Sequence, residues 1–355
     1  MQSIVIGIVT ILLYAVLKER DAETMIRALE SRKGLIQTHD NPRVDTYEYI
    51  SYLYADKGAI LTISKFNDSP WGLYVYLNPA QVLGSSDGLY RPDPKSYKQL
   101  HKTVDHMLSK IKAPHGLKDM KLSRVSVAVD LEMNKRYKVA AYLGILRQGF
   151  LPRHYANQPL QEDEVVSDAQ YVSEHFYRQS CKTTTFSVCD QVALNNLNTG
   201  LPLPQMGRKT LRLQIDLRRK AIRRKLKRKD REDHCKALMK LTEQADEIVT
   251  QQLRRMKLLN GCFLPYGEAV DAVSSKIKGE KARERMLFLL EKVLDTGNLT
   301  TAVYRLKQHF DLSNRKANRL LRKFRDLGIS PVTLQDSAKK SLPGLGALLE
   351  DVSKQ

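Results

Sequence analysis

The order of structural patterns along the chain changes once. Strand-like and helix-like segments alternate up to about residue 217, and beyond that point the pattern is helical. The clearest strand is LSRVSVAVDL at residues 122–131, in which Val125, Val127 and Val129 alternate with small or polar residues. A sheet-forming part followed by a run of helices predicts an α+β protein. We expect a mixed central β-sheet and then an all-helical C-terminal domain.

Other segments of the first part fit the same interpretation. The turn-rich sequence DSPWG lies between two strand-like runs and predicts a hairpin. Apolar residues after the loop at Pro94 fall on one stripe, which predicts an amphipathic helix. The expected strands are at residues 59–64, 72–77, 122–131, 183–190 and 210–217, and the expected helices are at about 94–112 and 136–147.

The first 17 residues, MQSIVIGIVTILLYAVL, contain no charge. This length is the lower limit for a membrane span of about 17–25 residues. A signal peptide is not indicated, because no basic residue precedes Lys18 and no small-residue cleavage site follows. Two interpretations stay open: a buried strand at residues 3–9 followed by a helix that continues from LLYAVL and ends at Gly34, or a single membrane anchor. Without an export signal we expect a cytoplasmic protein with reduced cysteines.

These patterns divide the chain into three parts. Residues 1–44 hold the apolar strand and helix or the anchor, residues 45–232 form an α+β domain that ends in a basic helix, and residues 233–355 form a helical DNA-binding domain. In the last part, a short loop joins TTAVYRLKQHF to NRKANRLLRKFRDLG, which is the spacing of a helix-turn-helix. An ordinary packed helical hairpin is the alternative. The second of these helices carries Arg315, Lys316, Arg319 and Arg322 as candidate DNA contacts.

The charge of the chain is concentrated in one region. The sequence has 59 Lys and Arg against 39 Asp and Glu, a formal net charge of +20. Residues 1–204 have a net charge of only +3, whereas residues 205–260 have 18 basic and 7 acidic residues, a net charge of +11. Such a cluster favours a polyanionic partner that binds through its phosphates. The candidate contacts in this cluster are Arg218, Arg219, Lys220, Arg223, Arg224, Lys225, Lys227 and Arg228.

Several kinds of catalytic site are missing from the sequence. No P-loop, GxSxG or CxxC motif occurs, and the eight histidines form no His-x-His pair. What remains is three acidic residues at strand positions, Asp130, Asp190 and Asp216. Carboxylates on neighbouring strands can hold a hard divalent cation such as Mg²⁺ or Mn²⁺, which would offset charge at a phosphodiester. An Asp at a strand end is also a common cap or turn residue.

Tyrosine is the most numerous aromatic residue, with 16 against eight Phe and one Trp. Tyrosines near strands of a basic protein can stack on unpaired bases, and one can attack phosphorus to form a covalent intermediate. Tyr171 and Tyr177 lie just before the strand at residues 183–190 and are the candidate nucleophiles. Simple packing is the alternative for each of them.

The order of these motifs resembles that of the rolling-circle replication initiators of plasmids and filamentous phages, the gene II/gene X type, and especially the variants of Gram-positive mobile elements. The resemblance covers about residues 45–335, and the order of the motifs is more specific than any single motif. It rests on VYLNPAQVLG (75–84), LSRVSVAVDL (122–131), FSVCDQVALNNL (186–197), LRLQIDLRRKAI (211–222) and FRDLGISPVTL (324–334).

The resemblance implies a nicking-and-joining domain in which a tyrosine attacks one strand of origin DNA with the help of Mg²⁺ or Mn²⁺. By position, Arg124 and Asp130 match the family's first acidic motif, Asp190 matches its second, and Arg212 matches the arginine of its last strand. Arg124 and Arg212 thereby join the candidate DNA contacts. The sequence departs from the family pattern where Ser126, Cys189, Gln191 and Gln214 stand in place of its Asp, Tyr, Lys and Glu.

We therefore predict a replication initiation protein of a phage, plasmid or integrated mobile element that binds single-stranded and duplex origin DNA. As an enzyme it would be a site-specific single-strand endonuclease and ligase. Host helicase or polymerase and a second copy of the chain are further expected partners. The alternatives are a non-catalytic DNA-binding regulator that uses the helix-turn-helix, and a basic protein anchored by residues 1–17 at an anionic membrane.

Overall fold

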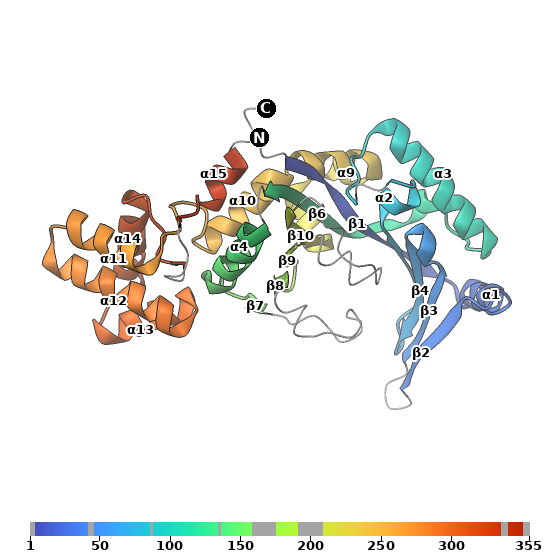
Figure 1. Ribbon diagram of the computed structural model, residues 1–355. Coiled ribbons are helices and arrows are strands. Elements are labelled where there is room, and N and C mark those ends of the chain that lie inside the picture. Colours follow the sequence, from blue (N-terminus) through green and yellow to red (C-terminus); the bar gives the residue numbers. More distant parts are fainter. Residues whose placement is uncertain are drawn as a thin grey trace.

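The computed structural model describes residues 4–41, 46–85, 88–133, 136–157, 175–190, 209–334 and 340–350. Within these ranges, ten strands form one antiparallel sheet, and helices cover the sheet and follow it along the chain (Figure 1). The strand order across the sheet is β2-β3-β4-β5-β1-β6-β10-β9-β8-β7. The protein is α+β, as the sequence predicts.

The strand predictions are confirmed with ends that move by a few residues, and β4 and β5 pair as the predicted hairpin. Four strands that the sequence analysis does not anticipate, β2, β3, β7 and β8, add to the edges of the sheet. The strands are β1 (Ile4–Leu17), β2 (Leu35–Asn41), β3 (Thr46–Tyr54), β4 (Ala59–Phe66), β5 (Trp71–Leu77), β6 (Lys121–Met133), β7 (Ala156–Asn157), β8 (Phe176–Ser180), β9 (Thr184–Asp190) and β10 (Lys209–Arg218).

The two expected helices of the first part are found as α3 and α4. α3 begins at a capping box, in which Asp93 accepts hydrogen bonds from two backbone amides and Pro94 takes the first helical position. The helices are α1 (Glu19–Glu30), α2 (Pro79–Val82), α3 (Pro94–Lys110), α4 (Arg136–Gln148), α7 (Arg219–Lys225), α8 (Arg228–Arg231), α9 (His234–Glu243), α10 (Ala245–Arg255), α11 (Tyr266–Lys276), α12 (Glu280–Thr296), α13 (Leu299–His309), α14 (Asn314–Asp326) and α15 (Leu345–Glu350).

The uncharged N-terminal run forms one long strand at the centre of the sheet. β1 continues to Leu17 because it pairs with β6 on one side and with β5 on the other, so the prediction of a helix from LLYAVL onward is wrong. The helix begins at Glu19, and the left-handed residue after it is Lys33, not Gly34. In the part of the chain that the structure describes, no helix has the length and apolar character needed to cross a bilayer.

The two faces of the sheet differ in character. On one face, which we call the apolar face, Val127 of β6 and Leu213 of β10 are fully buried. The helices α4, α9 and α10 contact β6, and their buried side chains belong to the same hydrophobic core as these two residues. The other face, the polar face, carries Ser126 of β6 with Gln214 and Asp216 of β10. Alternation along the strands produces this division, because successive side chains point to opposite faces.

The helices after the sheet form two groups (Figure 1). α9 and α10 contact β1 and β6, so packing places them with the sheet, although the predicted domain boundary at residue 233 lies before both. α11 to α14 contact one another and form a separate cluster. Isolated β-bridges join the segment before this cluster to the segments after it, with Cys262 paired to Ile329 and Phe263 paired to Leu342.

The predicted pair of helices in this cluster is present. α13 and α14 contact each other, and the Ser313 side chain caps α14 by accepting a hydrogen bond from the Lys316 amide. α14 buries Ala317, Leu320 and Phe324. Its opposite side leaves four basic side chains exposed to solvent, those of Arg315, Lys316, Arg319 and Arg322.

The core of the sheet gives a stability prediction. Leu213 is 0% exposed in β10, whereas Val16 of β1 is 46% exposed. We expect Leu213→Ala to lower the free energy of unfolding by about 2–5 kcal/mol, because it removes buried apolar surface and leaves a cavity. Val16→Ala, the matched control on the same sheet, should change it by less than about 0.5 kcal/mol. Urea unfolding followed by circular dichroism measures both, and equal effects would contradict this description of the core.

Candidate nucleic-acid interface

A buried ion pair joins β6 to β10 on the polar face. Asp130 and Arg212 lie directly opposite each other in the two strands. Arg212 Nε donates to Asp130 Oδ1 and Arg212 Nη2 donates to Asp130 Oδ2, each at 2.7 Å. The Asp130 side chain is 12% exposed and the Arg212 side chain 5%. Both oxygens of the predicted metal ligand and two nitrogens of the predicted DNA contact are therefore used within the protein.

The three predicted metal ligands do not lie together. Asp216 is on the same face as Asp130 but lies opposite Ser126, which precedes Asp130 by four residues in β6, and it accepts a hydrogen bond from Gln214 at 3.0 Å. Asp190 is opposite Leu211 and so lies on the apolar face, where His175 Nδ1 is 3.8 Å from its Oδ2. The described residues contain no group of three or more His, Cys, Asp or Glu that could hold a metal ion. The divalent cation stays a prediction.

The sequence contains a signal for this separation. Asp130 follows Val129 directly, so it points away from the valines of its strand. Asp190 is two residues after the buried Val188, which places it on the same face as that valine. The alternation of side chains along each strand therefore predicts, from the sequence alone, that Asp130 and Asp190 lie on opposite faces of the sheet.

One predicted nucleophile lies inside the protein, and the other lies outside the described residues. Tyr177 is in β8 opposite Val188, on the apolar face, and is 8% exposed. Burial raises the pKa of its phenol to about 12, although Arg147 acts to lower it. Its hydroxyl donates to Asn157 Oδ1 at 3.4 Å. In this arrangement the phenol is not presented to a phosphodiester in solvent. Tyr171 belongs to the segment that the structure does not describe.

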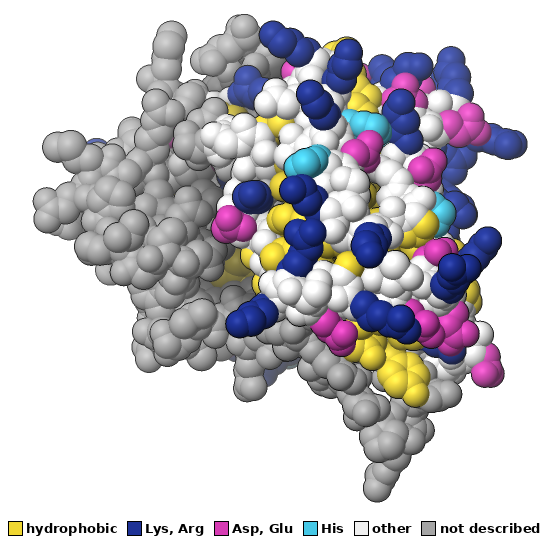
Figure 2. Space-filling model, turned by 90° about the vertical axis from the view of Figure 1, so that its right-hand side faces the viewer, with side chains coloured by type: hydrophobic (Ala, Val, Ile, Leu, Met, Phe, Trp, Pro, Cys, Tyr) yellow, Lys and Arg dark blue, Asp and Glu magenta, His cyan; other side chains and the backbone are white. Residues whose placement is uncertain are grey.

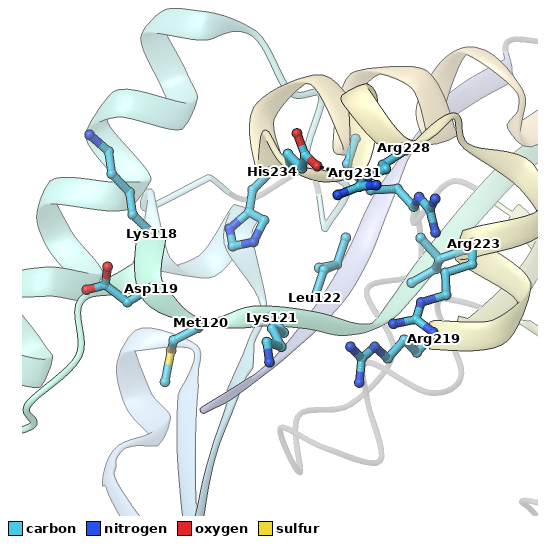
Figure 3. Close-up of a pocket in the computed structure, with 13 residues that line it drawn as sticks. Lys118, Asp119, Met120, Lys121, Leu122, Arg219, Arg223, Arg228, Arg231 and His234 are labelled. Atoms are coloured by element: carbon cyan, nitrogen blue, oxygen red, sulfur yellow. Dashed lines mark hydrogen bonds and ion pairs between the residues drawn. The ribbon is translucent and has the colours of Figure 1, made fainter. Parts of the chain in front are cut away.

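The basic segment surrounds a pocket of about 580 Å³ at one end of the sheet, which we call the α7–α9 pocket (Figure 3). β10 leads into α7 and α8 on one side of it, and the short helix η2 (Leu117–Asp119) with the start of β6 forms the other side. In Figure 3 the side chains of His234 and Arg231 extend toward the space between the two sides, whereas Lys118 and Asp119 point away from it. Its basic lining residues are Lys118, Lys121, Arg219, Arg223, Arg228 and Arg231, and its acidic ones are Asp119 and Glu232.

Two further polar groups belong to this pocket. The Nε of Arg231 is buried and has no hydrogen-bond partner among the described residues. His234 also lines the pocket, and burial lowers the pKa of its imidazole, although a hydrogen bond with the Met120 backbone and the charge of Asp233 act to raise it. The imidazole therefore adds a neutral polar group, and the positive potential of the pocket comes from Lys and Arg.

Most of the predicted basic contacts lie around α7. Arg219, Arg223 and Arg228 line the α7–α9 pocket, while Arg224 and Lys225 line a different pocket on the other side of the helix. The remaining three predicted residues of this segment, Arg218, Lys220 and Lys227, are exposed. Sequence reasoning missed Lys118, Lys121, Arg231 and His234. Arg231 lies three residues after Arg228, the last predicted contact of the basic cluster, whereas the two lysines come from about 100 residues earlier and are brought here by β6.

The polar face also carries aromatic side chains on β1 and β5, at the same strand end as the α7–α9 pocket, where Tyr14 lies opposite Lys121 of β6. Tyr14 and Tyr74 lie opposite each other in β1 and β5, with ring centroids 4.9 Å apart. The predicted contact Arg124 lies over the Tyr76 ring, 5.7 Å from its centroid. Aromatic rings beside arginine on a sheet can stack on unpaired bases. By contrast, on the side of the molecule that carries α1 and α3, Lys and Arg lie among Asp and Glu (Figure 2).

Comparison with known proteins gives little beyond this geometry. No protein-family model matches the sequence, and no curated protein matches it. One similar solved structure is that of a rolling circle replication initiator protein from Geobacillus stearothermophilus, with 9% sequence identity and a TM-score of 0.34. The match covers 72% of this chain and 86% of that chain. No residue role is transferred across a likeness this weak.

The ion pair between β6 and β10 gives a second prediction. Arg212→Met leaves the Asp130 carboxylate buried without its partner, so we expect the free energy of unfolding to fall by about 3–5 kcal/mol. The additional change Asp130→Leu should recover much of the loss, because it removes the uncompensated charge. Arg218→Met, at an exposed position of the same strand, should change stability by less than about 0.5 kcal/mol. If the double variant is as unstable as Arg212→Met, the two groups do not act as a pair.

Proposed function

We propose that this protein binds DNA and acts as a replication initiation protein, holding the phosphate backbone in the α7–α9 pocket. The observation that carries the proposal is that six basic residues, from two distant parts of the sequence, line one pocket that has only two acidic residues in its lining. Guanidinium groups match the geometry of phosphate oxygens and can donate two hydrogen bonds to one phosphate. The motif order of the sequence favours DNA among the polyanions.

Two further surfaces extend this proposal. The tyrosines and Arg124 on the polar face supply stacking positions for unpaired bases, which suits a single strand. The exposed basic side of α14 supplies contacts for a duplex, in the manner of the second helix of a helix-turn-helix. In this proposal, single strand and duplex are held by different parts of the chain.

The phosphate contacts are tested by matched charge changes. In Arg219→Gln/Arg223→Gln/Arg228→Gln, three exposed cations of the pocket are neutralised. We expect DNA binding to weaken and the dependence of log K on log salt to flatten by about 2–3 units, since each lost phosphate contact removes about 0.9. The control is Arg20→Gln/Arg27→Gln/Arg32→Gln in and beside α1, which has the same change in charge. An equal loss in both variants would contradict a pocket-centred interface.

Two versions of the proposal differ in whether the bound strand is cut. The resemblance implies nicking and rejoining by a tyrosine with Mg²⁺ or Mn²⁺. Specific contacts favour the second version, binding without cleavage: Tyr177 is buried, and Arg212 occupies both oxygens of Asp130.

Incubation with supercoiled and single-stranded DNA and either metal separates the two versions. Binding without cleavage predicts no nicked product and no covalent protein–DNA adduct that survives denaturation. An adduct that Tyr171→Phe removes and Tyr177→Phe keeps would instead establish nicking through Tyr171.

A further inference from the structure

A second pocket lies on the other side of α7. It has a volume of about 650 Å³, and we call it the α7–α10 pocket. Its walls come from α7, from α10, from the turn between β8 and β9, and from the segment after α4 that contains His154. Volumes of about 300–1,000 Å³ are typical of small-molecule sites. This pocket is separate from the α7–α9 pocket, because their lining residues do not overlap.

The lining of the α7–α10 pocket carries positive charge alone. It has five basic residues and, among the described residues, no Asp or Glu. Lys225 Nζ donates to Gln251 Oε1 at 3.2 Å, and Gln251 Nε2 donates in turn to Glu247, which is not part of the lining. Glu247 offsets part of the charge of Lys225 from outside the lining, but the lining cations still repel one another, and a bound anion would offset that repulsion. The five basic residues are Arg153, Lys182, Arg224, Lys225 and Arg255.

A buried amide adds an uncharged donor. Gln252 lines the pocket and is 2% exposed, and its Nε2 is buried with no hydrogen-bond partner among the described residues. A buried donor without a partner is costly, so a ligand that accepts from it gains affinity. The hydroxyl groups of Thr183 and Thr184 also belong to the lining residues. The site thus combines cations with neutral donors, which is the chemistry of a phosphate site.

We infer that the α7–α10 pocket binds a terminal phosphate group, carried either by a free nucleotide or by the end of a DNA strand. A terminal phosphate carries about −1.5 to −2 charges at neutral pH and three strong acceptor oxygens, whereas a phosphodiester carries one charge. The excess of cations over acids favours the more highly charged group. This inference does not depend on the proposed function, which places backbone phosphates on the other side of α7.

Cys181 reports whether the pocket is occupied. Its thiol lines the pocket, and Cys181 Sγ lies 3.7 Å from Thr183 Oγ1. Burial acts to raise the pKa of the thiol, but hydrogen bonds from Thr183, Tyr155 and Thr184 lower it below its usual value. The thiolate is the reactive form of cysteine. A bound anion would block this thiol and disfavour its thiolate, so both effects slow alkylation.

The first experiment measures alkylation of each cysteine of the full chain by iodoacetamide, with and without inorganic pyrophosphate. We expect millimolar pyrophosphate to slow modification of Cys181 about fivefold or more by blocking access. The exposed Cys262, which does not line the pocket, should react at an unchanged rate. Peptide mass spectrometry resolves the two sites. An unchanged rate at Cys181 would overturn the inference.

The second experiment compares two neighbouring arginines of α10. Arg255 lines the pocket and Arg254 does not, and both are exposed. As measured by the pyrophosphate concentration that half-protects Cys181 from alkylation, Arg255→Gln should weaken binding about tenfold, because one charge-assisted contact is lost. Arg254→Gln should weaken it by less than about twofold, since a surface charge outside the site adds little. Equal affinities in both variants would overturn the inference.

The same measurements separate this pocket from the proposed DNA interface. In Arg219→Gln/Arg223→Gln/Arg228→Gln, pyrophosphate should protect Cys181 from alkylation as it does in the unmodified protein, even if DNA binding is lost, because Cys181 lines only the α7–α10 pocket. The source of the phosphate is then identified with Cys181 as reporter. Protection by ATP supports a nucleotide, and protection by a short 5′-phosphorylated oligonucleotide, with none from its 5′-hydroxyl form, supports a strand end. If neither probe protects Cys181, the inference is wrong.

Discussion

The position of β10 between β6 and β9 decides how the rest of the molecule is arranged. Its register decides which side chains of the three strands share the apolar face and which share the polar face. A shift of one residue would move the side chains of β10 to the opposite faces. In this register Arg212 meets Asp130, the leucines of β10 enter the core, and Arg218 lies opposite Arg124 at the strand end. α7 then begins immediately beside the start of β6. The α7–α9 pocket is therefore a consequence of one strand pairing as much as of basic composition.

The α+β class and most central elements could be predicted from the sequence, because alternation and helical spacing are local signals. The uncharged N-terminal run was harder to interpret, since a continuous apolar segment can form either a strand or a buried helix. β1 is a strand over all of Ile4–Leu17 because its partners β5 and β6, more than 50 residues away in sequence, supply the hydrogen bonds. That information is absent from the run itself.

The candidate site was predicted in part for a related reason. The concentration of cations around α7 is visible in the sequence, but its division between two pockets depends on how α7 lies between η2, α9 and α10. Lys118 and Lys121 have no local signal that connects them to Arg219. The acidic residues show the opposite case, in which a local signal existed. Asp190 is two residues after Val188 and so lies on the apolar face with it, whereas Asp130 lies on the polar face.

The central place of β1 also has a consequence for how the chain folds during synthesis. β1 is synthesised before both of its partner strands, and it is an uncharged segment that pairs with residues 71–77 and 121–131. Until those partners are made, it is an exposed apolar strand with two open edges, the kind of segment that associates between chains. Contacts this distant in sequence also make folding slow. The protein should therefore depend on chaperones, or on slow translation, more than its basic surface would suggest.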